Sequence, residues 1–493
     1  MAIDRREFLR LATWVAAGAG ASACAPVYRQ LAGGAPALGA WPSDGMDFAL
    51  LSRMTYGPRP EERRRAAEIG LGNWIEEQLD PAKIDDSAAA WRVHTLEILK
   101  SNADELDDGD EEEILLQIQR GTLLRKVYSP RQLYETMVEF WSDHFNISIH
   151  KEGCLVLKIV DDREVIRRHA MGTFRDVLWA SAHSPAMLVY LDQQVSERSA
   201  PNENYARELM ELHTLSVQGG YSQKDVMELA RCLTGWTVKD HFWKGQFTFN
   251  PDLHDDGKKT VLGMAIAPSG QEEAESVLER LAHDPSTAQF IATKLARRFL
   301  HDQPEEGAPE IVERAAAAFQ RSGGDLKEVL RVVLLDGLAR GQGVGPKFKR
   351  PADYILSALR LLGAETDGGA SLQGYLGRMG QATFEWPTPD GAPDTAAPWS
   401  GNLVPRWQFA LALARNEVDG AQVNVSQLAQ SARALDPAGL LAELSYLLLG
   451  AALPPQAADG ILAAFGEKAS LEDPIFTEVV TAGLLASPAF QWR

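Results

Sequence analysis

The chain has 493 residues, of which 45% are hydrophobic and 24% charged, and its formal net charge is −19. Such an acidic chain repels nucleic-acid phosphates and anionic lipid headgroups, so we expect no nucleic-acid partner and no electrostatic docking to membranes. Its length is enough for a large core in two or three packed parts, and three cysteines are too few for a disulfide scaffold.

The first residues have the parts of an export signal. Arg5 and Arg6 precede the apolar run "LATWVAAGAG", which is too short to span a bilayer permanently. The adjacent arginines predict the twin-arginine route, which carries folded proteins. The small residues before Cys24 resemble a lipoprotein processing site, so we expect residues 1–24 to be a signal and Cys24 to be acylated; ordinary cleavage with an incidental cysteine is the alternative. Residues 25–45, rich in Ala, Gly and Pro, predict a flexible tether that holds the protein on the periplasmic side through lipid alone.

Helical periodicity dominates the rest of the chain. Apolar residues recur at three- and four-residue spacing in 114–128 and 131–145. Ser222 and Asp225 have the spacing of a capping box at the start of another helix. Five further helical segments are predicted after residue 270: 271–282, 286–300, 309–320, 325–335 and 351–363.

Two stretches interrupt this pattern. Residues 246–263 have strand-like ends around "DDGK", which predicts one small β-hairpin. Residues 384–402 are rich in Pro, Gly and Trp and predict a long ordered loop or lid, where function tends to lie. We therefore expect a mostly α, multi-helix globular array, with an N-terminal subdomain over 46–265 and a C-terminal one over 266–493.

The segment "PNENYARELMELHTLSVQGG" (201–220) admits two interpretations. Glu203, Arg207 and Glu211 follow one another at four-residue steps, as in a solvated ladder of ion pairs. Glu208 instead lies at the border of the apolar stripe, where a carboxylate needs a partner. His144, in the middle of the apolar face of 131–145, is such a partner, although a lone histidine there is more often a core residue.

Imidazole and carboxylate groups from three segments suggest a metal site. His144, Glu208, His254 and Asp255 would suit zinc, iron or manganese, although Asp-Asp-Gly is also good turn chemistry and no close spacing fixes the site. Glu208, Glu211 or Asp143 would move protons. Tryptophans in the irregular regions could stack on sugar rings or simply pack. The candidate ligand contacts are Asn204, Arg207, Trp236, Trp386 and Trp399.

Segments spread from about residue 46 to the C-terminus share a family pattern, and "NENYARELMELHTL" is the most specific of them. Others are "FALLSRMTYGPRPEE", "MVEFWSDHFNIS", "HDDGKKTVLG", "WPTPDG" and "LLASPAFQWR". Together they resemble the bacterial domain-of-unknown-function family 1800. The resemblance implies an exported protein whose gene neighbour is a sulfatase- or phosphatase-like protein of family 1501, and it assigns no activity. It also implies phenylalanine in place of His213, which argues against a ligand role for that residue.

Two functions remain open at this point. The first is a periplasmic metal-dependent enzyme, hydrolytic or oxidative, that uses the histidine and carboxylate residues. The second is a lipid-tethered binding or accessory protein that works with the sulfatase-like partner on a polysaccharide.

Overall fold

The computed structural model describes residues 43–106, 109–239, 245–424, 434–466, 469–471 and 473–493. The predicted signal, Cys24 and almost all of the predicted tether lie outside these residues. The tether's last residues, 43–45, begin the first described helix, α3. No helix in the described ranges is long and apolar enough to cross a membrane.

The fold is mostly α-helical, as predicted, and its helices share apolar faces that pack together. The N-terminal helices are α3 (Ser43–Met54), α4 (Pro60–Ile69), α5 (Leu71–Leu79), α6 (Ser87–Val93), α7 (Ala103–Leu106), α8 (Glu111–Tyr128), α9 (Gln132–His144) and α10 (Cys154–Val160). The central helices are α11 (Phe174–Ala182), α12 (Pro185–Tyr190), α13 (Glu203–Glu211), α14 (Gln223–Leu233), α15 (Glu272–Ala282), α16 (Pro285–Phe299), α17 (Pro304–Gly307), α18 (Pro309–Ser322) and α19 (Leu326–Arg331). The C-terminal helices are α20 (Pro351–Leu361), α21 (Ala370–Arg378), α22 (Leu403–Ala414), α24 (Pro437–Leu449), α25 (Pro455–Phe465), α26 (Pro474–Ala486) and α27 (Pro488–Gln491).

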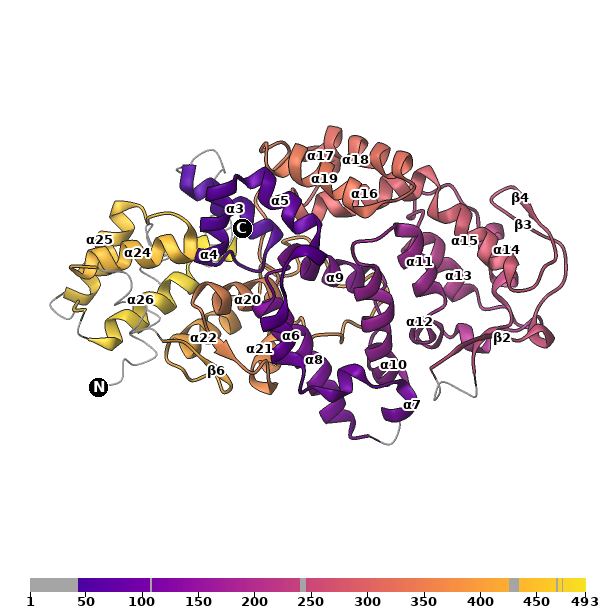
Figure 1. Cartoon of the computed structure of the whole chain (residues 1–493), viewed down its shortest axis with the longest axis horizontal. Coiled ribbons are helices and arrows are strands. Elements are labelled where there is room, and N and C mark those ends of the chain that lie inside the picture. Colours follow the sequence, from indigo (N-terminus) through magenta and orange to yellow (C-terminus); the bar gives the residue numbers. More distant parts are fainter. Residues whose placement is uncertain (1–42, 107–108, 240–244, 425–433, 467–468, 472) are drawn as a thin grey trace.

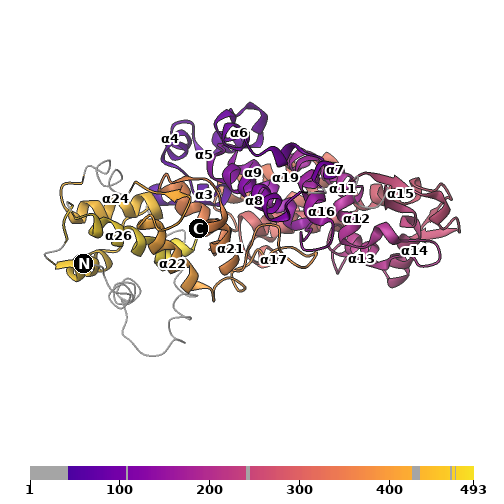
Figure 2. The same cartoon turned by 90° about the horizontal axis from the view of Figure 1, so that it is seen from below.

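The molecule is elongated, with α24, α25 and α26 at one end and α14 and α15 at the other (Figure 1). The same ends separate in the perpendicular view, and α9 lies between them in both (Figure 2). Two large cores stabilise this arrangement by removing apolar surface from water. The larger runs from α3 to residue 338, and the smaller joins α6 and α8 to the helices after residue 350. The larger core therefore takes residues from both sides of position 265.

Local signals explain several helix starts. Asn202 caps α13 by accepting a hydrogen bond from the Asn204 amide. Ser222 and Asp225 form the predicted capping box of α14. Helix α13 ends at Glu211. The amides of Leu212 and His213 both donate to the Glu208 carbonyl, so the chain leaves the helical path directly after Glu211.

The strands pair differently from the single hairpin predicted over 246–263. β2 (Phe247–Phe249) pairs with β1 (Trp236–Val238), and β3 (Lys259–Val261) pairs with β4 (Met264–Ile266). The turn between β3 and β4 is at Leu262 and Gly263, whose φ values are both positive, as a tight hairpin turn requires. The "DDGK" stretch therefore connects two small sheets. A third pair joins β5 (Glu365–Thr366) to β6 (Ala421–Gln422).

Candidate ligand-binding site

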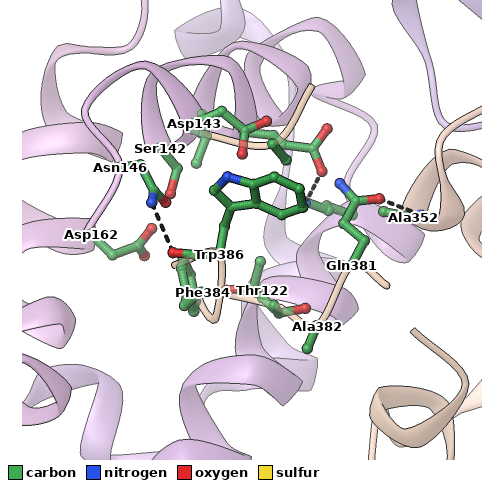
Figure 3. A pocket seen from close by; sticks show the side chains of 15 residues that line it. Thr122, Ser142, Asp143, Asn146, Asp162, Ala352, Gln381, Ala382, Phe384 and Trp386 are labelled. Carbon is green, nitrogen blue, oxygen red and sulfur yellow. Dashed lines mark hydrogen bonds and ion pairs between the residues drawn. The ribbon is translucent and has the colours of Figure 1, made fainter. Parts of the chain in front are cut away.

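Two cavities meet at the C-terminal end of α9, beneath the segment 384–402. The larger has a volume of about 320 Å³ and the smaller about 60 Å³, and Asp143 lines both. In the smaller cavity the indole of Trp386 lies across the space, between Asp143 and Asn146 on one side and Gln381 on the other (Figure 3). The end of α9 and the segment 384–402 thus form a common wall between the two cavities.

Charged side chains line the larger cavity. The cations are Lys294, Arg297, Arg298 and Arg350, and the carboxylates are Asp143, Asp390 and Asp394. Most of these groups already have partners. Arg350 Nη1 donates to Asp143 Oδ2 at 2.8 Å, and Arg297 Nη2 donates to Glu305 at 3.0 Å.

A buried carboxylate, Glu139, organises the floor beneath these cations. It accepts hydrogen bonds from Lys126 at 2.6 Å, from Arg298 at 3.2 Å and from Arg350. Burial alone would raise the pKa of Glu139, but these three cations lower it to about 2. Glu139 is therefore ionised at neutral pH and is held by hydrogen bonds from three cations. Breaking one of these pairs would leave a charge buried without compensation.

Two nitrogen atoms that belong to cations of the cavity, Nη1 of Arg298 and Nζ of Lys294, lack an anionic partner at hydrogen-bonding distance. Arg298 is almost fully buried; its Nη1 has no hydrogen-bond partner, and the Asp394 carboxylate is 3.9 Å away. Lys294 is half-buried, and no carboxylate of the described residues lies within 4.0 Å of its Nζ. Since buried donors are normally paired, the cavity offers two places for oxygen atoms of a ligand.

Lys294 instead donates a hydrogen bond to His144, with 2.8 Å between Nζ and Nδ1. The Nε2 atom of His144 faces the carbonyl oxygen of His213 at 3.1 Å, and a carbonyl can only accept. Nε2 therefore carries the hydrogen, and Nδ1 presents its lone pair to the lysine. Burial lowers the pKa of His144 well below its ordinary value, and the charge of Lys294 lowers it further. Burial likewise lowers the pKa of Lys294 to about 8.

The segment 384–402 is a fixed wall over the cavities. The Asn146 side chain donates to the carbonyls of Trp386 and Thr388, at 3.0 and 2.8 Å. Lys347 donates to the carbonyl of Asp394, and Asp302 accepts from the Ala396 amide, both at 2.8 Å. These bonds, spaced along the segment, hold its backbone in one path, which fits the ordered loop predicted from its composition.

The structure does not bring the four predicted metal ligands together. His144 uses both ring nitrogens as described above. Both ring nitrogens of His254 face acceptors, the Thr234 carbonyl at 2.8 Å and Glu273 at 3.1 Å. Asp255 binds Arg231 through both of its oxygens. Among the described residues, no group of three or more His, Cys, Asp or Glu side chains is placed to hold a metal ion.

The predicted residues of α13 line neither cavity, and each of them is half-buried or exposed. Glu208 is half-buried, and burial raises the pKa of its carboxyl, with a smaller contribution from Glu211. Glu211 accepts from the Tyr221 hydroxyl at 3.3 Å. Arg207 lies 3.5 Å from Glu203 and donates to Gln223, so the first step of the predicted ladder exists and is linked to α14. Asn204 is exposed, and its side chain reaches the Leu191 carbonyl.

The three predicted aromatic contacts have different surroundings. Trp236 is fully buried against the rings of His183 and Phe247, so no ligand reaches it in this structure. Trp399 is also buried and donates to the Pro393 carbonyl at 2.9 Å, so it packs beneath the wall. Trp386 is half-buried and lines the smaller cavity.

Sequence reasoning missed the cations of the larger cavity. Phe290, Lys294 and Arg298 are four residues apart on α16, so they lie on one face. A sequence signal was available, because these two charged residues share a helix face with the aromatic residue Phe290. Arg350, just before Pro351 at the start of α20, has a local partner in Asp353, but its other two partners, Glu139 and Asp143, come from α9 and could not be read from the local sequence.

Comparison with known families supports the resemblance. A family model described as a protein of unknown function (DUF1800) matches residues 49–492, nearly the whole chain, and confirms the predicted membership. No curated protein matches the chain, and neither does any solved structure.

Proposed function

The chain belongs to the DUF1800 family, which defines no activity, and we propose that it binds an anionic carbohydrate in the cavity of about 320 Å³ beneath segment 384–402. One observation carries the proposal: Lys294 and the Nη1 atom of Arg298 line the same cavity without an anionic partner at hydrogen-bonding distance. Carboxylate or sulfate oxygens of a sugar would accept charge-assisted hydrogen bonds from both nitrogen atoms.

The rest of the cavity suits the remainder of a sugar. Asp390 is exposed and Thr395 also lines the cavity, so both can meet hydroxyl groups. Phe290 and Pro393 provide apolar surface for a ring face. Ligand sites commonly combine mostly apolar walls with a few convergent polar groups, and cavities of about 300 Å³ are large enough.

We also propose where this binding takes place. The protein would be exported by the twin-arginine route and anchored through Cys24, and it would present the bound sugar to a sulfatase- or phosphatase-like partner of family 1501. A sulfatase or phosphatase removes anionic groups, so a partner of this kind that acts on sugars would share its substrates with a cavity that binds anionic carbohydrate.

A metal-dependent enzyme has less support from the side chains. His144 and His254 have no free nitrogen lone pair in this arrangement, and Asp255 is neutralised by Arg231. A metal would have to displace Lys294 from one histidine and Glu273 from the other. Binding rather than metal chemistry is therefore the function that we propose.

Calorimetric titration with oligosaccharides tests the binding. Oligouronates or sulfated oligosaccharides should bind at least about tenfold more tightly than a neutral oligosaccharide of equal length. Lys294→Met should weaken that binding, whereas Lys258→Met, at an exposed lysine remote in sequence, should not. Equal binding of charged and neutral sugars would contradict the proposal.

Cell fractionation tests the proposed export and lipid anchoring. Arg5→Lys combined with Arg6→Lys should leave the protein in the cytoplasm, because the route recognises the arginine pair. Cys24→Ala should release it from membranes without changing its melting temperature. A Cys24→Ala protein that stays in the membrane fraction after a high-salt wash would exclude the lipid anchor.

A further inference from the structure

Lys294 has the surroundings of a reactive amine. Nucleophilic lysines lie away from water and beside other cations, and lack a carboxylate that would hold them as ammonium ions. Lys294 is half-buried, and Phe290 and Phe140 lie over its ammonium group, with ring centroids 5.5 and 6.0 Å from Nζ. Arg297 and Arg298 follow it on the same helix and line the same cavity, and the aspartates that also line it are all more than 4.0 Å from Nζ.

His144 adds a proton acceptor at the amine itself. Its Nδ1 lone pair faces Nζ at 2.8 Å, and the hydrogen bond from Nε2 to the His213 carbonyl holds the ring in that orientation. When Lys294 is the neutral amine and donates one N–H to His144, its own lone pair is directed elsewhere. Because the side chain also lines the cavity, that lone pair is available to a ligand there.

We propose that Lys294 forms an imine with an anionic carbonyl compound, such as the open-chain form of a uronic acid at the reducing end of a sugar chain. This inference rests on the proposed function for its ligand class and adds a covalent step to it. The aldehyde carbon would meet Nζ while the carboxylate pairs with the Nη1 atom of Arg298, which has no hydrogen-bond partner.

The step balances without any further reagent. Nζ attacks the carbonyl carbon, a C–N bond forms, and the π electrons move to the oxygen. A proton leaves nitrogen for His144 Nδ1 and passes to that oxygen, which gives a carbinolamine. A second N–H proton follows the same path, the C–O bond breaks, and the carbonyl oxygen leaves as water with both amine hydrogens. The product is a neutral imine.

Borohydride trapping tests the proposal. The full chain is incubated with glyoxylate, a small anionic aldehyde, then reduced and mapped by peptide mass spectrometry. We expect one glyoxylate-derived adduct at Lys294, formed at least about tenfold faster than at the exposed Lys258. Acetaldehyde, which has no carboxylate, should label Lys294 more slowly. Labelling spread over exposed lysines, with Lys294 no faster than Lys258, would overturn the inference.

Lys294→Arg separates the two proposals, because it keeps the charge and loses the nucleophile. It should still bind an oligouronate whose reducing end has been converted to an alditol, and it should give no adduct at position 294. If the wild-type chain binds that alditol but gives no trapped adduct, the imine proposal is contradicted and the proposed function stands. Trapping of glyoxylate without oligouronate binding would support the reactive lysine and contradict the proposed carbohydrate ligand.

Discussion

Lys294 and His144 are 150 residues apart in the chain and are joined by a hydrogen bond of 2.8 Å inside the protein. The lysine comes from α16 and the histidine from the last residue of α9. The pair places an amine, normally a surface group, beside a neutral imidazole at the wall of a cavity. The first prediction follows from the cost of keeping that amine charged.

Lys294→Met should change the pH dependence of stability. Burial lowers the pKa of Lys294 in the folded protein from 10.5 to about 8, so the unfolded state binds more protons between these values. Below pH 8 the lysine is charged in both states and its burial cost is complete. As pH rises from 8 to 10.5, the wild-type protein should gain about 2 kcal/mol relative to Lys294→Met. Urea unfolding at pH 7, 9 and 10.5 measures this; a constant difference would contradict the shift.

His213→Phe should stabilise the protein by about 1 kcal/mol. The Nε2 atom of His213 is buried without a hydrogen-bond partner, and burial lowers the pKa of the ring to about 3, so the ring is neutral near pH 7. Phenylalanine removes the unpaired polar atom, while the backbone carbonyl still accepts from His144. Thermal and urea unfolding would show the gain. The exposed His283→Phe is the control and should stay within about 0.5 kcal/mol of wild type.

Gly391→Ala should destabilise the wall of the cavity. Gly391 has φ +75°, and a Cβ there would lie 2.0 Å from the backbone oxygen of Asp143. The segment must move away from α9, which should cost about 2 kcal/mol or more and weaken oligosaccharide binding. Gly374→Ala is a matched control, because that glycine is inside α21 with nothing within 4 Å of its added Cβ. It should stabilise slightly; equal effects of the two changes would refute the close contact.

Glu208→Gln should stabilise the protein modestly, by up to about 1 kcal/mol at pH 7. The pKa of Glu208 is raised by burial and by Glu211, so its ionised form is disfavoured in the folded state. The gain should disappear as pH falls through the raised folded pKa toward the ordinary value, because both states are then protonated. Glu211→Gln should stay within about 0.5 kcal/mol. A loss of stability in Glu208→Gln would mean that the carboxylate has a stabilising partner.

Several helices, one helix cap and the family could be predicted from the sequence, because each depends on residues close together in the chain. The 3.6-residue spacing of apolar side chains predicted α8, α9, α14 and the helices after residue 270. The capping box of Ser222 and Asp225 needs only a short stretch of chain, and it formed as predicted. The family pattern likewise came from linear motifs, and the match over residues 49–492 confirms it.

Tertiary structure alone decided which side chains meet. The sequence marked His144 and His254 as candidate metal ligands, but their partners, Lys294 and Glu273, lie on helices that only packing brings near. The strand pairing depended on a turn at Leu262 and on β1, outside the predicted hairpin. Helix periodicity reports which face is buried, whereas the identity of a contact across that face depends on how distant helices cross. The cationic cavity was therefore visible only once α9, α16 and segment 384–402 were in place.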